Sequence, residues 1–256
     1  MAASGGGTRF MNALRWPWFR AAAFLIERLV LPGIQVHYAL RKRLIEELVR
    51  QRLEDGARQV IVLGAGVDTL AYRLHREFPE VIFIEVDHPA TQRVKVDVLA
   101  GAVGSNLAVL PLDISTQDSR EALVKCPDFR PDADTLLIAE GLLMYLEASA
   151  VDRIMRMTAE HPGSSAIIFT FMEPRPDGRV AFQHSGKLVD WWLRRRGEPF
   201  RWGVRREELS GFLAARGLVL QLVATPDELR RRYLSNPAID GLSSVNGDYV
   251  CAAIRR

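Results

Sequence analysis

Short apolar runs alternate with helical patterns along this 256-residue chain, and this alternation restricts the fold more than any other feature. Continuous apolar runs rich in β-branched residues are typical of parallel strands that are covered on both faces. Their alternation with helices predicts βαβ units, and therefore an α/β fold with a doubly wound, mainly parallel, seven-stranded sheet. The expected strands lie at 59–63, 81–86, 107–110, 135–139, 166–171, 218–223 and 249–254.

Helical patterns separate these strands, but one stretch after the fifth strand breaks the rhythm. Residues 173–204 contain Pro174, Pro176 and Gly178, with one helical pattern over 182–196. This composition predicts a helical lid inserted beside the strand ends. The remaining helices are expected at 36–53, 69–77, 89–99, 120–125, 147–159 and 205–216.

The chain is long and apolar enough for one domain, because 48% of its residues are hydrophobic. We expect a disordered segment at 1–9 and one domain over 10–256 that begins with helices at 10–55. Glu27 and Arg28 interrupt the N-terminal apolar run before it reaches the ~18 residues of a membrane span. We therefore expect a helix lying on the domain and no stable membrane insertion; a membrane-surface helix is the alternative.

Composition also bears on compartment and partners. Cys126 and Cys251 are the two cysteines, and a lone pair in a chain of this size does not indicate a disulfide framework. Free thiols predict a reducing, cytoplasmic location. The net charge of +3 is too small to indicate a nucleic-acid partner, and the sequence does not indicate an oligomeric state.

A glycine-rich turn follows the first expected strand. Gly64 and Gly66 allow a tight turn with close approach of the backbone to a ligand, which is typical of a nucleotide site between a strand and a helix. The dinucleotide fingerprint requires a third glycine where Thr69 stands, and Asp68 would repel a diphosphate at the helix N-terminus. S-adenosylmethionine has no phosphate and carries an ammonium and a sulfonium group, so Asp68 favours this cofactor over NAD.

Acidic residues also follow the next expected strands, where ligands bind in such sheets. Asp87 ends the second strand about 20 residues beyond the glycines, the position that grips a ribose diol, and we favour it over Glu85. After the third strand, Asp113 is placed to accept from an adenine amine and Ile114 to pack on the ring. Glu140 ends the fourth strand, where it would face the methionine part of the cofactor.

Together these motifs resemble the leucine carboxyl methyltransferase family, whose bacterial members are S-adenosylmethionine-dependent O-methyltransferases. The resemblance runs from about Tyr38 to Ala159, and beyond Ala159 it rests on layout alone. It implies a Rossmann-like class I methyltransferase fold without a metal site. One departure is Leu70, where bacterial relatives commonly have Arg. The matching stretches are 38–43, 58–74, 83–89 and 139–146.

The resemblance also implies roles for individual residues. Arg41 would pair with the cofactor carboxylate, which an arginine fork suits, although the helix phase leaves Lys42 and Arg43 open as alternatives. Gly64 would contact the cofactor with its backbone. The resemblance assigns the ribose, adenine and ammonium contacts to the residues already named: Asp87, Asp113, Ile114 and Glu140.

The methyl acceptor is expected to be a small acid or phenol. A carboxylate is already ionised at neutral pH, whereas a phenol benefits from a base. His184 in the lid is the candidate base, and Tyr145 is placed one turn beyond Glu140 to face the acceptor. The lid region also offers cationic and flat aromatic side chains for an anionic ring: Arg194, Arg195, Arg196, Arg201, Arg205, Arg206, Trp191, Trp192 and Trp202.

Three other functions stay open at this stage. The acceptor could be the C-terminal carboxylate of a protein, which would require an open groove over the lid. A basic nucleic-acid-binding methyltransferase would show a continuous arginine stripe and steep salt dependence. A nicotinamide enzyme is disfavoured by Asp68 and Thr69.

Overall fold

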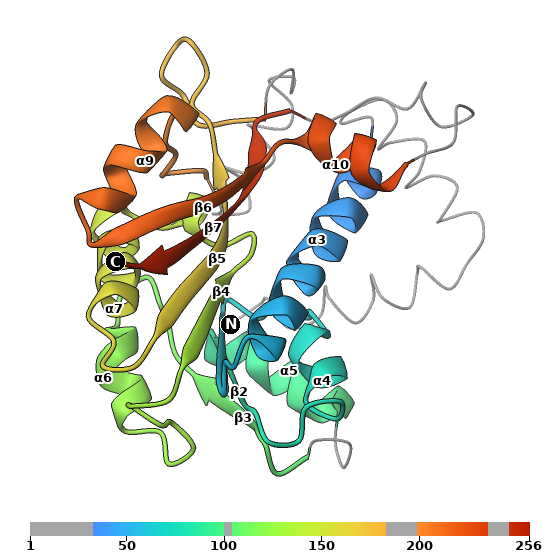
Figure 1. Cartoon of the computed structure of the whole chain (residues 1–256), viewed down its shortest axis with the longest axis vertical. Helices are drawn as coiled ribbons and strands as arrows, with labels where there is room; N and C mark the ends of the chain where they lie inside the picture. The colour runs from blue at the N-terminus through green and yellow to red at the C-terminus, as the bar shows by residue number, and fades with distance from the viewer. Residues whose placement is uncertain (1–32, 100–103, 183–198, 235–245) are drawn as a thin grey trace.

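The computed structural model describes residues 33–99, 104–182, 199–234 and 246–256. Its seven strands form one sheet in the order β3-β2-β1-β4-β5-β7-β6 (Figure 1). The first five strands pair in parallel, and β7 runs antiparallel to both β5 and β6. The predicted doubly wound, mainly parallel sheet is confirmed. The strands are β1 Gln59–Leu63, β2 Ile82–Asp87, β3 Leu107–Pro111, β4 Thr135–Ala139, β5 Ser165–Met172, β6 Leu218–Ala224 and β7 Asp248–Arg255.

Helices cover both faces of this sheet (Figure 1). One layer contains α6, α7 and α9, and the other contains α3, α4, α5 and α10. The strands are apolar on both faces because each face is covered by a helical layer. The helices are α3 Ile34–Glu54, α4 Leu70–Leu74, α5 Pro89–Leu99, α6 Ser119–Val124, α7 Ala148–Ala159, α9 Arg206–Ala214, α10 Pro226–Tyr233 and the short 3-10 helix η1 Leu143–Tyr145.

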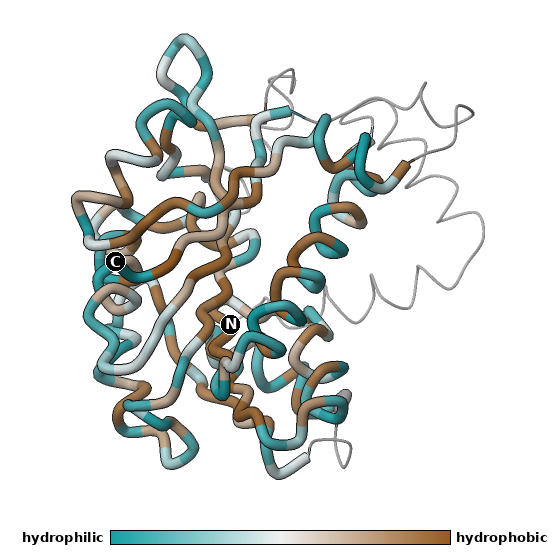
Figure 2. Tube along the Cα trace, in the orientation of Figure 1, coloured by the Kyte–Doolittle hydropathy of each residue, from teal (hydrophilic) through white to brown (hydrophobic). Residues whose placement is uncertain are grey.

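Two apolar cores lie on the two faces of the sheet. Ile61 and Leu63 of β1 pack on one face with α6, α7 and α9, while Val60 and Val62 pack on the other face with α3 and α4. This division follows from the two-residue period of a strand, in which successive side chains point to opposite faces. Figure 2 shows the result as hydrophobic colour concentrated along the central strands.

Two helix predictions need correction. The helix expected at 69–77 covers only Leu70–Leu74, because the chain continues from there in turns. Helix α10 was not predicted, although its start carries a recognisable signal. The Thr225 side chain accepts from the Glu228 backbone N–H, and the Glu228 side chain accepts from the Thr225 backbone N–H. Such a capping box, with Pro226 in the first turn, favours a helix at that point.

Only the two ends of the expected lid lie within the described residues. Pro174 and Val180 form an isolated antiparallel bridge, and the backbone N–H of Arg201 donates to the carbonyl of Met144 over 2.7 Å. Trp202 is buried in the apolar core beside α9, where its ring centroid lies 5.5 Å from that of Phe212, so it closes the core. The other expected features lie outside the described residues: the disordered segment 1–9, the N-terminal helix before residue 33, the lid helix at 182–196 (apart from Phe182), His184, Trp191, Trp192 and Arg194–Arg196.

Within the described ranges, no helix is long and apolar enough to span a membrane.

Candidate cofactor site

The strand order reverses between β1 and β4, and the residues that follow these two strands meet there. Gly64 has φ +66°, and its backbone N–H donates to the carbonyl of Val86 over 2.8 Å. A Cβ at Gly64 would lie 2.9 Å from Cδ1 of Leu142 in the loop after β4. Glycine is therefore required both by the backbone conformation and by the closeness of the two loops. In open α/β sheets this reversal point is where ligands bind.

Asp87 anchors the glycine loop to the end of β2. Its Oδ2 accepts from the backbone N–H of Gly66, and its Oδ1 accepts from the backbone N–H of His88 over 2.5 Å. Gly66 has φ +51°, so the second glycine also adopts a left-handed conformation. Each carboxylate oxygen can accept a further hydrogen bond. Asp87 is thus held beside the loop with acceptor capacity for a ribose diol.

Glu85, the alternative to Asp87, has a structural partner instead. It is buried, and its Oε2 lies 2.7 Å from Nζ of Lys95 on α5. Burial raises the pKa of Glu85, although Lys95 opposes this effect. Lys95 also donates to the backbone carbonyl of Asp68 over 2.5 Å. This pair ties β2 and α5 to the glycine loop, which supports the choice of Asp87 as the ligand contact.

Asp68 and Glu140 share one lysine ammonium. Nζ of Lys42 on α3 lies 2.8 Å from Oδ2 of Asp68 and 3.3 Å from Oε2 of Glu140. The other oxygen of Asp68 accepts from the backbone N–H of Leu70 over 2.9 Å, at the start of α4. Burial acts to raise the pKa of Asp68, but Lys42 and the backbone N–H groups of Leu70 and Thr69 together outweigh it, and the pKa lies below its usual value. Carboxylates from the tips of β1 and β4 thus face the same cation.

Arg41 is buried beside this pair and is directed at two carboxylates. Its Nε donates to Oε1 of Glu140 over 3.0 Å, and its Nη1 donates to Oδ2 of Asp248 over 2.6 Å. Its guanidinium lies 4.5 Å from the centroid of the Tyr38 ring. Burial acts to lower the pKa of Arg41, but Asp248 and Glu140 outweigh it and raise the pKa. A contact between Arg41 and the cofactor carboxylate stays a prediction.

The phase of α3 separates the three basic candidates. Arg41 and Lys42 both reach Glu140. Arg43 points toward α10 instead: its guanidinium lies 4.6 Å from the centroid of the Tyr233 ring, and its Nε lies 3.5 Å from Glu47. Arg43 is therefore excluded from the cofactor side of the helix.

Sequence reasoning missed Asp248, the first residue of β7. Asp248 is fully buried, and its Oδ2 also accepts from Nε2 of His37 over 2.9 Å. Burial acts to raise the pKa of Asp248, but Arg41 and His37 hold it below its usual value. Because β7 runs antiparallel to β5, its start lies at the edge where the parallel strands end; Asp248 pairs there with Met172. No sequence motif marks this position.

Asp113 and Ile114 follow β3, next to the end of β2. The backbone N–H of Leu112 donates to the carbonyl of Asp87 over 2.8 Å, which places this loop beside the ribose candidate. Oδ1 of Asp113 accepts from both the backbone N–H and the hydroxyl of Ser115, at 3.0 and 2.5 Å, and these bonds lower its pKa. Ile114 is buried in the apolar core. Their adenine contacts stay predictions.

The acceptor residues are less well placed by the structure. Tyr145 lies on η1 at the cofactor edge, with its ring centroid 5.3 Å from that of Phe200. Three of the arginines proposed to attract an anionic acceptor have carboxylate partners: Arg201 with Glu147 at 2.5 Å, Arg206 with Glu173 at 3.4 Å, and Arg205 with Glu207 at 3.8 Å. All three remain partly exposed, so their attraction of an anionic acceptor stays a prediction.

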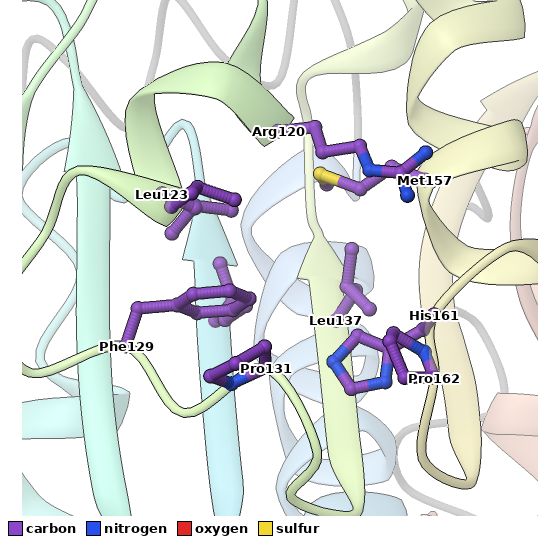
Figure 3. A pocket seen from close by; sticks show the side chains of 10 residues that line it. Arg120, Leu123, Phe129, Pro131, Leu137, Met157, His161 and Pro162 are labelled. Carbon is purple, nitrogen blue, oxygen red and sulfur yellow. The ribbon is translucent and has the colours of Figure 1, made fainter.

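A separate apolar pocket lies between α6 and α7, away from all the predicted site residues. Its volume is about 80 Å³. In Figure 3 the aromatic ring of Phe129 lies with Pro131 and His161 at one end of the pocket, and Arg120 lies with Met157 at the other end. It contains none of the carboxylates described above. Among the described residues, there is also no group of three or more His, Cys, Asp or Glu side chains that could hold a metal ion.

Comparison with known proteins supplies the family. Residues 10–159 match the model of the leucine carboxyl methyltransferase family. The chain belongs to the leucine carboxyl methyltransferase family. A relative from Mycolicibacterium smegmatis, named as an S-adenosyl-L-methionine-dependent methyltransferase, is 35% identical over 62% of this chain and 52% of its own length. One from Frankia alni with the same type of name is 28% identical over 74% of this chain and 64% of its own length.

This member of the leucine carboxyl methyltransferase family spans about half to two thirds of the length of those relatives. Its fold is similar to that of magnesium protoporphyrin IX methyltransferase from Synechocystis, which was solved with bound S-adenosylhomocysteine. The two structures give a TM-score of 0.52 at 14% identity, and the match covers 88% of this chain and 85% of the other. The pyocyanin biosynthetic protein PhzM gives a TM-score of 0.51 at 14% identity, over 97% of this chain and 68% of the other. The relatives from Mycolicibacterium smegmatis and Frankia alni are named for S-adenosyl-L-methionine, the cofactor that the sequence predicts for this chain.

Proposed function

We propose that this chain is an S-adenosylmethionine-dependent O-methyltransferase that methylates a carboxylate or a phenolic hydroxyl of a small molecule. The observation that carries the proposal is the meeting of Asp68 and Glu140, from two different strand tips, on one ammonium group. A pair of carboxylates that faces a lysine ammonium is suited to the ammonium and sulfonium groups of the cofactor. The family name supports an oxygen acceptor, because it describes methyl transfer to a carboxyl group.

The residues present fit this cofactor. Asp68 and Glu140 would face its cationic groups, and Asp87 would accept from the ribose hydroxyls. The loop at Asp113 and Ile114, hydrogen-bonded to the end of β2, would contact the adenine. Arg41 has N–H groups beyond those used by its two carboxylate partners, and these can donate to the cofactor carboxylate. When bound, the cofactor supplies an electrophilic methyl group.

The protein's own contribution is orientation and exclusion of water. An apolar cluster at the cofactor edge supports this role. Met144, Met172 and Phe182 are buried there, with Tyr145 and Phe200 packed against them. A carboxylate acceptor needs no base on such a surface, whereas a phenol must lose its proton. Tyr145 and His184 are the candidates to take part in that proton transfer.

The other acceptor classes are less well supported. A nucleic-acid partner is less well supported because the net charge of the chain is only +3. Cys126 and Cys251 are free thiols, which supports our placing the enzyme in the cytoplasm.

An assay of S-adenosylhomocysteine production tests the proposal. The protein is incubated with S-adenosylmethionine and, separately, a panel of small carboxylic acids, a panel of phenols, peptides with a free C-terminal carboxylate, and an RNA. We expect turnover with members of one of the first two panels. Turnover with peptides or RNA alone, or with none of the four, would overturn the small-molecule assignment. The Asp87→Asn variant controls for contaminating activity.

A further inference from the structure

Lys42 and Arg41 are neighbours on α3 that reach the same carboxylate, but they are held very differently. The Arg41 side chain is 9% exposed and is fixed by Asp248 as well as by Glu140. The Lys42 side chain is 51% exposed, and in the part of the chain that the structure describes it forms ion pairs with Asp68 and Glu140 only. An ammonium on a flexible stem can leave such a position at small cost, because exposed ion pairs contribute little to stability.

The charge balance of the site indicates what Lys42 does there. Asp68, Glu140 and Asp248 carry negative charges, and Arg41 and Lys42 carry positive ones. If Lys42 leaves, the remaining groups have an excess of two negative charges. Both forms of the cofactor carry an ammonium and a carboxylate, and only S-adenosylmethionine carries a sulfonium in addition. The site without Lys42 therefore favours a cationic ligand, and it favours the substrate form of the cofactor over the product form.

We propose that Lys42 occupies the position of the cofactor's amino group, that cofactor binding displaces it, and that its return promotes release of S-adenosylhomocysteine. This inference rests on the proposed function, because it assigns the position between Asp68 and Glu140 to the cofactor. It makes Lys42 a competitor of the ligand. It differs from the assignment of a basic residue to the cofactor carboxylate, which predicts that the same lysine strengthens binding.

Calorimetric titration of variants with S-adenosylhomocysteine separates these two roles. In Lys42→Met the competitor is absent, and the ligand no longer has to break the ion pairs of Lys42 with Asp68 and Glu140. We therefore expect S-adenosylhomocysteine to bind roughly 3- to 10-fold more tightly than it binds to the unaltered protein. 5′-Methylthioadenosine lacks the amino-acid part of the cofactor, and its affinity should stay unchanged. Lys42→Arg keeps a cation at this position and should bind S-adenosylhomocysteine no more tightly than the unaltered protein does.

Arg43→Met is the matched control. It removes one positive charge from the next residue of the same helix, but Arg43 points toward Tyr233 and Glu47. Its affinity for S-adenosylhomocysteine should therefore differ little from that of the unaltered protein. An equal gain in Arg43→Met and Lys42→Met would attribute the effect to net charge and would overturn the displacement role.

Weaker or unchanged binding of S-adenosylhomocysteine by Lys42→Met would also overturn the proposal, and weaker binding would make Lys42 a direct cofactor ligand. Both results leave the methyltransferase assignment intact, because the unaltered protein still binds. Failure of the unaltered protein to bind S-adenosylhomocysteine would overturn the displacement proposal and the proposed function together. Thermal melting of each variant verifies that it is folded before titration.

Discussion

Arg41 and Asp248 form a buried ion pair of 2.6 Å that joins residues 207 positions apart in the chain. One lies near the start of α3 and the other is the first residue of β7. Because Arg41 also donates to Glu140, the pair connects the antiparallel strand to the tip of β4. The cofactor edge is thus held together by charges from three elements that are distant in sequence.

Removing one partner of this pair should be costly. Asp248→Asn keeps the shape of the side chain but leaves Arg41 with Glu140 as its single carboxylate. We expect a loss of about 3 kcal/mol in the free energy of unfolding, since two buried side chains, Arg41 and His37, would each lose a hydrogen bond to a charged carboxylate. Urea unfolding measures this loss. Glu121→Gln, which removes the partner of Lys125 in an exposed pair, is the control and should cost less than ~1 kcal/mol. Equal losses in the two variants would contradict the account.

Asp87→Asn should weaken cofactor binding without unfolding the protein. The amide keeps the size of the side chain but removes the charge and one acceptor that a ribose diol requires. Hydrogen bonds to charged groups are worth about 1.5–3 kcal/mol, so S-adenosylhomocysteine should bind roughly 10- to 100-fold more weakly. Asp97→Asn, an exposed change on α5, should bind like the unaltered protein. Unchanged affinity in Asp87→Asn would mean that the ribose lies elsewhere.

Gly64→Ala tests the close approach of the two loops. The new Cβ would lie 2.9 Å from Cδ1 of Leu142 on a backbone with φ +66°, so we expect a loss of about 2–3 kcal/mol in unfolding free energy and weaker cofactor binding. Gly178→Ala is the matched control, because Gly178 has φ +79° but nothing within 4 Å of the added Cβ. Leu142→Ala should partly rescue Gly64→Ala. Equal losses at the two glycines, or no rescue, would show that backbone strain alone acts.

His161 should make the protein less stable in mild acid. The backbone N–H of Gly163 donates to Nδ1, so Nε2 carries the proton of the neutral ring, and among the described residues it has no hydrogen-bond partner. Burial lowers the pKa of His161 below its usual 6.5. The unfolded chain therefore binds the proton more tightly, and the contribution of the neutral ring is fully present above pH 6.5 and lost as the pH falls below it.

Urea unfolding at pH 8 and pH 5.5 measures this dependence. His161→Asn does not titrate and retains an acceptor for Gly163, so its loss of stability between the two pH values should be smaller than that of the unaltered protein. The same loss in both proteins would show that His161 does not contribute.

The local pattern of the sequence was sufficient for most of the sheet. The strands at Gln59–Leu63 and Thr135–Ala139 have the predicted bounds, because an apolar run between polar residues marks a buried parallel strand. The glycine loop and the strand-tip carboxylates were found for a related reason, since the residues after parallel strands meet at one edge. Asp68 and Glu140 meet there, as this rule requires.

The remaining features depend on relationships that a local pattern does not contain. Asp248 enters the site because β7 is inserted antiparallel between β5 and β6, and the chain order of the strands does not reveal this. The partners of Arg201 and Arg206 come from distant segments, so the sequence alone does not reveal these ion pairs. Helix α10 was missed although its capping box from Thr225 to Glu228 was readable.

The central claim is that the carboxylates at the strand tips bind a cationic sulfur nucleoside and not a dinucleotide. Isothermal titration of the unaltered protein with S-adenosylhomocysteine and, in parallel, with NAD tests it most directly. The account predicts saturable heat at one site per chain with S-adenosylhomocysteine and no heat with NAD. Saturable heat with NAD and none with S-adenosylhomocysteine would contradict it.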